Sequence, residues 1–180
     1  MLPGLEVKFA GGAPVLTEGQ VIEGYASLFG VTDQGGDAVA RGAFAASLAR
    51  LAVRGDKVRM LWQHDPTRPI GVWDEIREDD SGLWVKGRLL PEVTQAREAA
   101  ALIQAGAIDG LSIGYRTIRA ERDQKGRRVL AEVELWEVSL VTFPMLPEAK
   151  VGRKEAEDLR EMAQAFHAAA EILRADRAEV

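Results

Sequence analysis

Few side chains in this sequence could carry out covalent chemistry, and two of them stand in distinctive settings. His64 is one of only two histidines in 180 residues. Ser112 lies between Gly110 and Gly114, in a stretch that otherwise has the apolar character of a strand. A serine hydroxyl becomes nucleophilic when an imidazole takes its proton, and the same imidazole can later protonate the leaving group. This pair of residue types therefore points to acyl-transfer chemistry.

A third group comes from the apolar run at 135–141 (LWEVSLV), which contains Glu137. An unpaired buried carboxylate is costly, so a carboxylate in such a run indicates a partner. We expect Glu137 to orient the imidazole of His64 and to stabilise its protonated form. Asp65 is the alternative, but adjacent side chains on a strand or loop usually diverge. That divergence favours Glu137.

Two hairpin registers would bring these groups to one face of a strand pair. A two-residue turn at 125–126 would put Gly126 at its second position, where primed turns favour glycine. It places Ser112 opposite Ser139, with Glu137 as its diagonal neighbour roughly 7–8 Å away, a gap that admits an imidazole. A turn at 124–125 would instead put Glu137 directly opposite Ser112, still on the same face. The first register suits a triad better, and a shift of one residue would break either arrangement.

The composition excludes several other chemistries. The absence of cysteine excludes thiolate nucleophiles, disulfides, zinc fingers and iron–sulfur clusters. Asp33, Asp37 and Asp65 with one usable histidine lack the spacing of metal ligands, so we expect neither a metal nor a cofactor. The letters of 110–114 match the Gly-x-Ser-x-Gly elbow of the α/β-hydrolases. That elbow turns from strand to helix, however, whereas strand-like sequence continues here.

The net charge argues against nucleic acids as partners, and the lack of long apolar runs argues against membranes. The formal net charge is −5, which disfavours binding to phosphate backbones. Basic residues do cluster at 116–128, but they alternate with Glu121 and Asp123 and have no stacking aromatic residues. We interpret this cluster as a solvated hairpin tip. No apolar run approaches the ~18 residues of a membrane span, and residues 1–10 do not have the pattern of a signal peptide, so we expect a soluble protein.

The apolar patterns predict a β-rich α+β fold with two internal helices in one domain, 1–151, followed by a charged helical extension, 152–180. Strands are expected at 5–9, 21–29, 57–62, 71–78, 83–90, 108–119 and 127–143, and helices at 43–53 and 92–104. His64 is expected in a loop stiffened by Pro66 and Pro69. Apolar positions in 154–177 recur every 3.5 residues, which suits packing on a partner helix, with docking on its own domain as the alternative.

An ordered set of segments resembles the prohead (capsid maturation) proteases of tailed bacteriophages, the HK97-like family. The segments are 24–29 (GYASLF), 37–44 (DAVARGAF), 61–65 (LWQHD), 69–71 (PIG), 82–83 (GL), 110–115 (GLSIGY), 137–141 (EVSLV) and 144–151 (PMLPEAKV). The resemblance covers residues 20–151. Any one segment is weak evidence, whereas the ordered set is highly specific.

The resemblance implies a serine endopeptidase with Ser112 as nucleophile, His64 as base and Glu137 as the acidic third member. It implies action inside the immature procapsid, in the bacterial cytoplasm, on the major capsid protein, on scaffold segments and often on the protease itself. It also implies a fold related to herpesvirus assemblins, a closed or nearly closed β-barrel ringed by helices. The alternative from another class is a non-catalytic capsid assembly or scaffold protein that retains the protease fold.

Two further expectations concern the end of the chain. In assemblin-like enzymes an oxyanion-hole amide comes from the loop after the third triad member, which here is 144–147 (PMLP). Prolines lack an N–H group, so Met145, Leu146 or Glu148 would donate. We expect the extension 152–180 to recruit the protease to scaffold or capsid protein, and self-association would be a further contact.

Overall fold

The computed structural model describes residues 6–10, 15–17, 20–33 and 35–143. These residues form nine strands and two helices. In chain order they are β1 (Glu6–Ala10), β2 (Val15–Thr17), β3 (Val21–Leu28), β4 (Asp37–Val39), α1 (Ala45–Arg54), β5 (Arg59–Trp62), β6 (Asp65–Glu78), β7 (Gly82–Leu89), α2 (Thr94–Gln104), β8 (Gly110–Arg122) and β9 (Arg128–Val141).

Every strand and helix predicted within the described residues is confirmed, with ends displaced by a few residues. The short strands β2 and β4 were not predicted, because three residues are too few to show a period of two. The predicted His64 loop is wrong in extent, since Pro66 and Pro69 belong to strand β6. The boundary at 151–152 and the helix at 154–177 lie outside the described residues.

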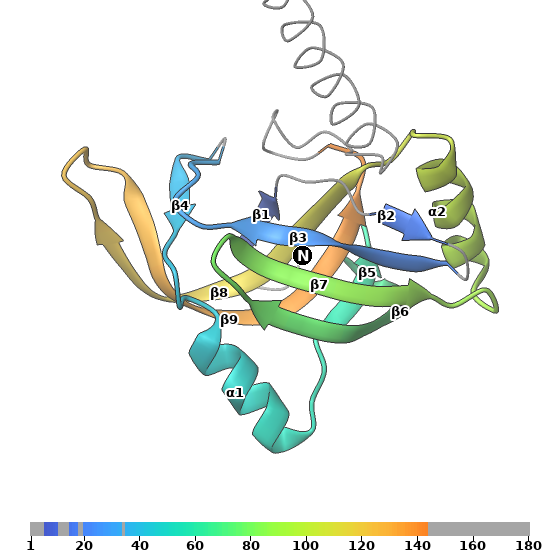
Figure 1. The fold of residues 1–180 in the computed structure, drawn as a ribbon, viewed down its shortest axis with the longest axis horizontal. Coiled ribbons are helices and arrows are strands. Elements are labelled where there is room, and N and C mark those ends of the chain that lie inside the picture. Colours follow the sequence, from blue (N-terminus) through green and yellow to red (C-terminus); the bar gives the residue numbers. More distant parts are fainter. Residues whose placement is uncertain (1–5, 11–14, 18–19, 34, 144–180) are drawn as a thin grey trace, which may run out of the picture.

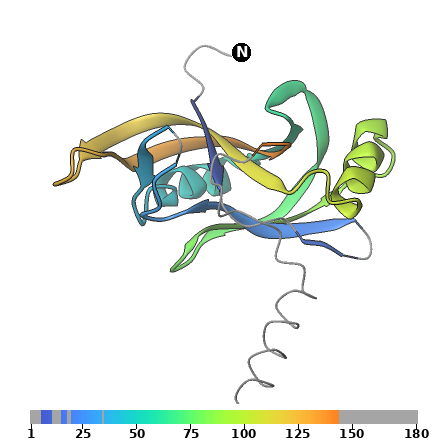
Figure 2. The ribbon, with the colours of Figure 1, turned by 90° about the horizontal axis from the view of Figure 1, so that it is seen from above.

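One sheet contains all nine strands and curls into a half-barrel (Figures 1 and 2). Its order is β1-β8-β9-β5-β6-β7-β3-β2, and β4 pairs separately with β9. Within the described residues no ladder joins β1 to β2, and the two helices lie at different places around the sheet. The fold is therefore β-rich and curled, whereas a closed barrel ringed by helices is not confirmed.

Helix α1 closes a gap in this sheet. Strand β9 pairs with β4 near its start and with β5 near its end, which leaves the backbone between them to find other partners. The Val133 N–H donates to the Ala43 carbonyl at 3.0 Å, just before α1. The Leu135 N–H donates to the Ser47 hydroxyl of α1 at 2.9 Å. The start of α1 thus continues the edge of β9 where no strand is available.

The two faces of the β8–β9 pair differ in chemistry because side chains alternate along a strand. One face carries Leu111, Ile113, Val138 and Leu140, all fully buried in the main core. The other face carries Ser112, Gly114, Glu137 and Ser139. Beyond this region the β8–β9 hairpin projects from the rest of the sheet as an arm whose residues are largely exposed (Figure 1).

The role of Ser47 gives a stability prediction. Ser47→Ala removes the acceptor of the Leu135 N–H, which would stay buried without a partner, so we expect the free energy of unfolding to fall by about 1–3 kcal/mol. Val53→Ala is the control in the same helix, because Val53 is 89% exposed. It should change stability by less than ~0.5 kcal/mol. Urea unfolding measures both, and equal midpoints for Ser47→Ala and the wild type would contradict the gap-closing role.

Candidate active site

The first of the two predicted registers of the β8–β9 hairpin is confirmed at Ser112 and Glu137. Ser112 pairs with Ser139, and Gly114 pairs with Glu137. Ser112, Glu137 and Ser139 therefore share one face, with Glu137 diagonal to Ser112. All three are buried, with Ser112 and Ser139 fully so and Glu137 3% exposed. The sequence thus placed the candidate nucleophile and the candidate carboxylate correctly relative to each other.

The turn that was expected to produce this register is nevertheless wrong. The hairpin ends in a three-residue loop, 124–126, in which the Gly126 N–H donates to the Asp123 carbonyl at 2.9 Å and Gly126 has φ +77°. The Asp123 carboxylate accepts from the amides of Lys125 and Arg127. The Arg127 side chain lowers the pKa of Asp123 by hydrogen bonding to it. These bonds favour a type I turn with a following left-handed glycine over a two-residue primed turn.

Bulges restore the register between the tip and the site. At the tip Arg122 pairs with Arg128, one residue out of phase with the Ser112–Ser139 pair. Register shifts lie along the ladder, and the one nearest the site makes Trp136 an extra residue on β9. A bulge changes which side chains face the partner strand, and bulges are common beside active sites. The bulge at Trp136 therefore helps to place Glu137 on the face of Ser112.

Gly114 makes room for the Glu137 side chain. A Cβ atom on Gly114 would overlap the Glu137 Oε1 atom and lie 2.7 Å from its Cδ. The carboxylate of Glu137 therefore lies directly over the backbone of β8, where only a glycine leaves space. The glycine two residues after Ser112 is therefore required by packing against Glu137 on a strand, and not by a Gly-x-Ser-x-Gly elbow.

His64 lies in a strained two-residue turn between β5 and β6. Gln63 and His64 have φ of +53° and +60°, the left-handed values of a type I′ turn, although neither is glycine. Such strain is on the order of 1–3 kcal/mol per residue and persists where the surroundings impose it. The Gln63 N–H donates to the Leu140 carbonyl at 2.9 Å, and the Gln63 side-chain amide donates to the Thr142 hydroxyl at 2.6 Å. The end of β9 thus holds the turn.

The imidazole of His64 contacts the buried carboxylate directly. His64 Nδ1 lies 2.5 Å from Glu137 Oε1, and the two side chains are 15% and 4% exposed. With Nδ1–H donating to the carboxylate, Nε2 is the basic nitrogen of the neutral ring. The other oxygen, Glu137 Oε2, accepts from the Ser139 hydroxyl at 2.5 Å. The His64 N–H donates to the same hydroxyl at 3.2 Å.

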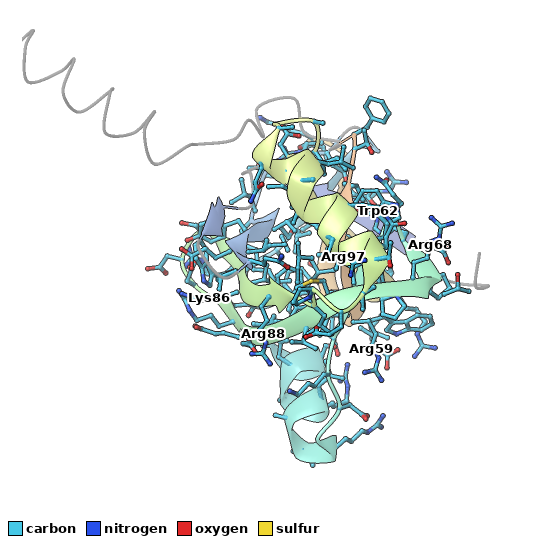
Figure 3. The ribbon with its side chains drawn as sticks, turned by 90° about the vertical axis from the view of Figure 1, so that its right-hand side faces the viewer. Arg59, Trp62, Arg68, Lys86, Arg88 and Arg97 are labelled. Carbon is cyan, nitrogen blue, oxygen red and sulfur yellow. The ribbon has the colours of Figure 1, made fainter. Side chains whose placement is uncertain are left out.

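Asp65, the alternative carboxylate, is engaged elsewhere. It accepts from the Thr67 hydroxyl at 2.6 Å and from the Thr67 N–H at 2.9 Å. Hydrogen bonds from the Thr67 side chain and then its backbone hold the pKa of Asp65 below its usual value. The carboxylate in contact with His64 is therefore that of Glu137. Figure 3 shows Trp62, the last residue of β5, and Arg68 of β6 on the side of the molecule that carries α2.

Ser112 lies on β8 and Glu137 on the neighbouring strand β9. His64 lies in the turn after β5, which is the neighbour of β9 on its other side. Sequence reasoning missed the supporting roles of Gln63 and Ser139. A signal for Ser139 was present, since it lies two residues after Glu137 and so on the same face. The proposed oxyanion donors Met145 and Leu146 lie outside the described residues.

Neither helix in the described part of the chain is long and apolar enough to span a membrane.

The space over Gly114 gives a spectroscopic prediction. The short Nδ1–H to carboxylate hydrogen bond should give a strongly deshielded imidazole proton in the ¹H NMR spectrum. Gly114→Ala should displace the Glu137 carboxylate and abolish this signal, as should Glu137→Gln. Ile118→Ala is the control, because Ile118 lies on the same strand and is 46% exposed. Persistence of the signal in folded Gly114→Ala would contradict the packing argument.

Comparison with known proteins identifies a family and a similar fold. The family model described as caudovirus prohead serine protease matches residues 11–165. The prohead protease of Enterobacteria phage HK97 is 33% identical over 156 residues, 85% of this chain and 66% of the relative. The prohead protease of Escherichia phage T5 is 30% identical over 126 residues, 68% of this chain and 57% of the relative. The chain thus spans somewhat under two thirds of the length of these relatives.

A solved structure shares the fold at low sequence identity. The bacteriophage T4 capsid assembly protease matches with a TM-score of 0.60 over 76% of this chain and 96% of that chain, at 16% identity. The family match extends across the strands that carry Ser112 and Glu137 and the turn that carries His64. On that match, the chain belongs to the caudovirus prohead serine protease family.

Proposed function

We propose that this chain is a serine endopeptidase that processes the major capsid protein or scaffold segments during procapsid maturation. Its family and the names of its HK97 and T5 relatives support a maturation protease. The observation that carries the proposal is the buried Nδ1–carboxylate contact between His64 and Glu137, with Ser112 on the adjacent strand and the same face. A scaffold protein has no need for this arrangement.

The proposed reaction follows from the roles of these three groups. Ser112 Oγ attacks the carbonyl carbon of the scissile peptide bond while His64 Nε2 takes the hydroxyl proton. The C–N bond then breaks as Nε2 gives that proton to the leaving amine, which leaves an acyl-enzyme ester on Ser112. Water attacks the ester, with His64 again taking and returning a proton, and the acid product and free Ser112 result. Throughout, the Glu137 carboxylate stabilises the imidazolium and fixes its tautomer.

The surroundings of the carboxylate favour this chemistry. Glu137 is nearly fully buried, so its attraction to a protonated His64 is weakly screened by solvent. The negative oxygen of the tetrahedral intermediate needs its own donors, and we assign them to backbone amides of Met145 or Leu146. Leu146→Pro would remove one such donor, and undiminished turnover in that folded variant would count against Leu146.

The proposal also covers the complete fold, the substrates and the place where they are cleaved. We infer a complete fold that resembles the nearly closed, helix-ringed barrel of the assemblins, as the resemblance in the sequence implies. The substrates would be capsid protein, scaffold segments and the chain itself, inside the procapsid in the bacterial host. No cofactor takes part in the proposed reaction. The domain 1–151 would carry catalysis, and 152–180 would carry recruitment.

Replacement of the nucleophile tests the proposal. Co-expression of the wild type with its capsid protein should shorten the capsid band, and mass spectrometry of the new N-terminus should give the cleavage site. Ser112→Ala should lower the cleavage rate by at least ~10⁴-fold, because the acyl-enzyme cannot form. Ser27→Ala is the control, since Ser27 is also a buried strand serine but lies on β3.

The outcomes separate the candidate functions. Equal shortening by the wild type and Ser112→Ala would show that the serine assignment is wrong. If neither shortens the capsid protein, the non-catalytic assembly or scaffold function gains support.

Deletion of 152–180 tests the recruitment role. The truncated protein should still cleave a peptide that spans the mapped site, because the proposed triad lies before residue 144. It should enter particles less often, which quantitative immunoblotting of purified procapsids measures. Normal packaging of the truncated protein would contradict this role.

A further inference from the structure

We propose that Ser139 is a positioning residue that holds both members of the His64–Glu137 pair through a single hydroxyl. This inference rests on the proposed function. Ser139 pairs across the ladder with Ser112, so it lies directly opposite the nucleophile and on the same face. It does not itself need to touch the substrate, because its effect acts through the base and the carboxylate.

The hydrogen bonds of Ser139 assign its proton. A serine hydroxyl has one proton and two lone pairs. The His64 backbone N–H is only a donor, so the Ser139 oxygen accepts from it at 3.2 Å. The hydroxyl proton is therefore directed to Glu137 Oε2, at 2.5 Å. One oxygen atom thus fixes the backbone that carries the imidazole and the carboxylate that orients it.

Both contacts act on groups that need support. His64 has φ +60°, a left-handed value that a non-glycine residue keeps only when its surroundings hold it there. Glu137 is 3% exposed and Ser139 fully buried, so water cannot readily replace either bond. Loss of the hydroxyl would loosen the turn and would leave Glu137 with one donor fewer.

Ser27 shows that a buried strand serine in this fold need not have such a role. Ser27 is 1% exposed, and its hydroxyl has no hydrogen-bond partner within the described residues. It lies on β3, which does not neighbour β8, β9 or β5 in the sheet order. Ser27→Ala is therefore a matched control for Ser139→Ala in size, burial and strand location.

The test measures the reactivity of Ser112 without knowledge of the substrate. The full-length protein is treated with a fluorophosphonate, which esterifies a serine activated by a base. The second-order rate of labelling at Ser112 is followed by mass spectrometry. Ser139→Ala should label about 10–100-fold more slowly at pH 7, the effect of losing a hydrogen bond to a charged group. Ser27→Ala should label at the wild-type rate.

A double variant distinguishes positioning from general destabilisation. Because Ser139 acts in part through Glu137, the loss of labelling rate in Ser139→Ala combined with Glu137→Gln should be smaller than the product of the two single losses. Multiplicative losses in the double variant would overturn the inference. So would a wild-type labelling rate for Ser139→Ala, or a loss that only follows its unfolded fraction in urea.

The same experiment separates this inference from the function on which it rests. If the wild type is labelled at Ser112 but Ser139→Ala behaves as the wild type does, the positioning role fails and the protease proposal stands. If Ser112 of the wild type is not labelled at all, the proposed function fails and takes this inference with it.

Discussion

The buried carboxylate of Glu137 is the constraint on which the rest of the site depends. Its charge is sheltered from water, so the protein must supply partners for both oxygens. The imidazole of His64 meets Oε1, and the hydroxyl of Ser139 meets Oε2. Gly114 leaves the space in which the carboxylate lies. The same burial that makes an unpaired carboxylate costly makes a paired one an effective support for a protonated base.

Strand β9 organises the site because it lies between β8 and β5 in the sheet. From β8 it receives the candidate nucleophile, and from the turn after β5 it receives the candidate base. His64 and Glu137 are 73 residues apart in the sequence, yet the parallel β5–β9 ladder brings the histidine turn to the end of β9. A carboxylate on the central strand can therefore contact the base while sharing a face with the nucleophile.

The free-energy cost of the site is offset by contacts from the same strand. The turn at Gln63 and His64 has unfavourable backbone angles, and three hydrogen bonds from its residues to Leu140, Thr142 and Ser139 hold it in place. Further along β9, helix α1 supplies backbone partners where no strand continues the sheet. The strained turn that carries His64 is therefore held by the same strand that carries Glu137.

The sequence by itself determined seven of the nine strands, the two helices and the absence of thiol chemistry, because these follow from residue type and local period. It also predicted that Ser112 and Glu137 share a face. It placed the hairpin turn wrongly, and the correct pairing at Ser112 depends on bulges that leave no periodic signal. The tertiary structure alone decided the position of His64, the contact of its imidazole with Glu137 and the bond of its backbone to Ser139. Contacts between residues far apart in the chain fix all three, and no local pattern encodes a left-handed histidine that only neighbouring strands can hold.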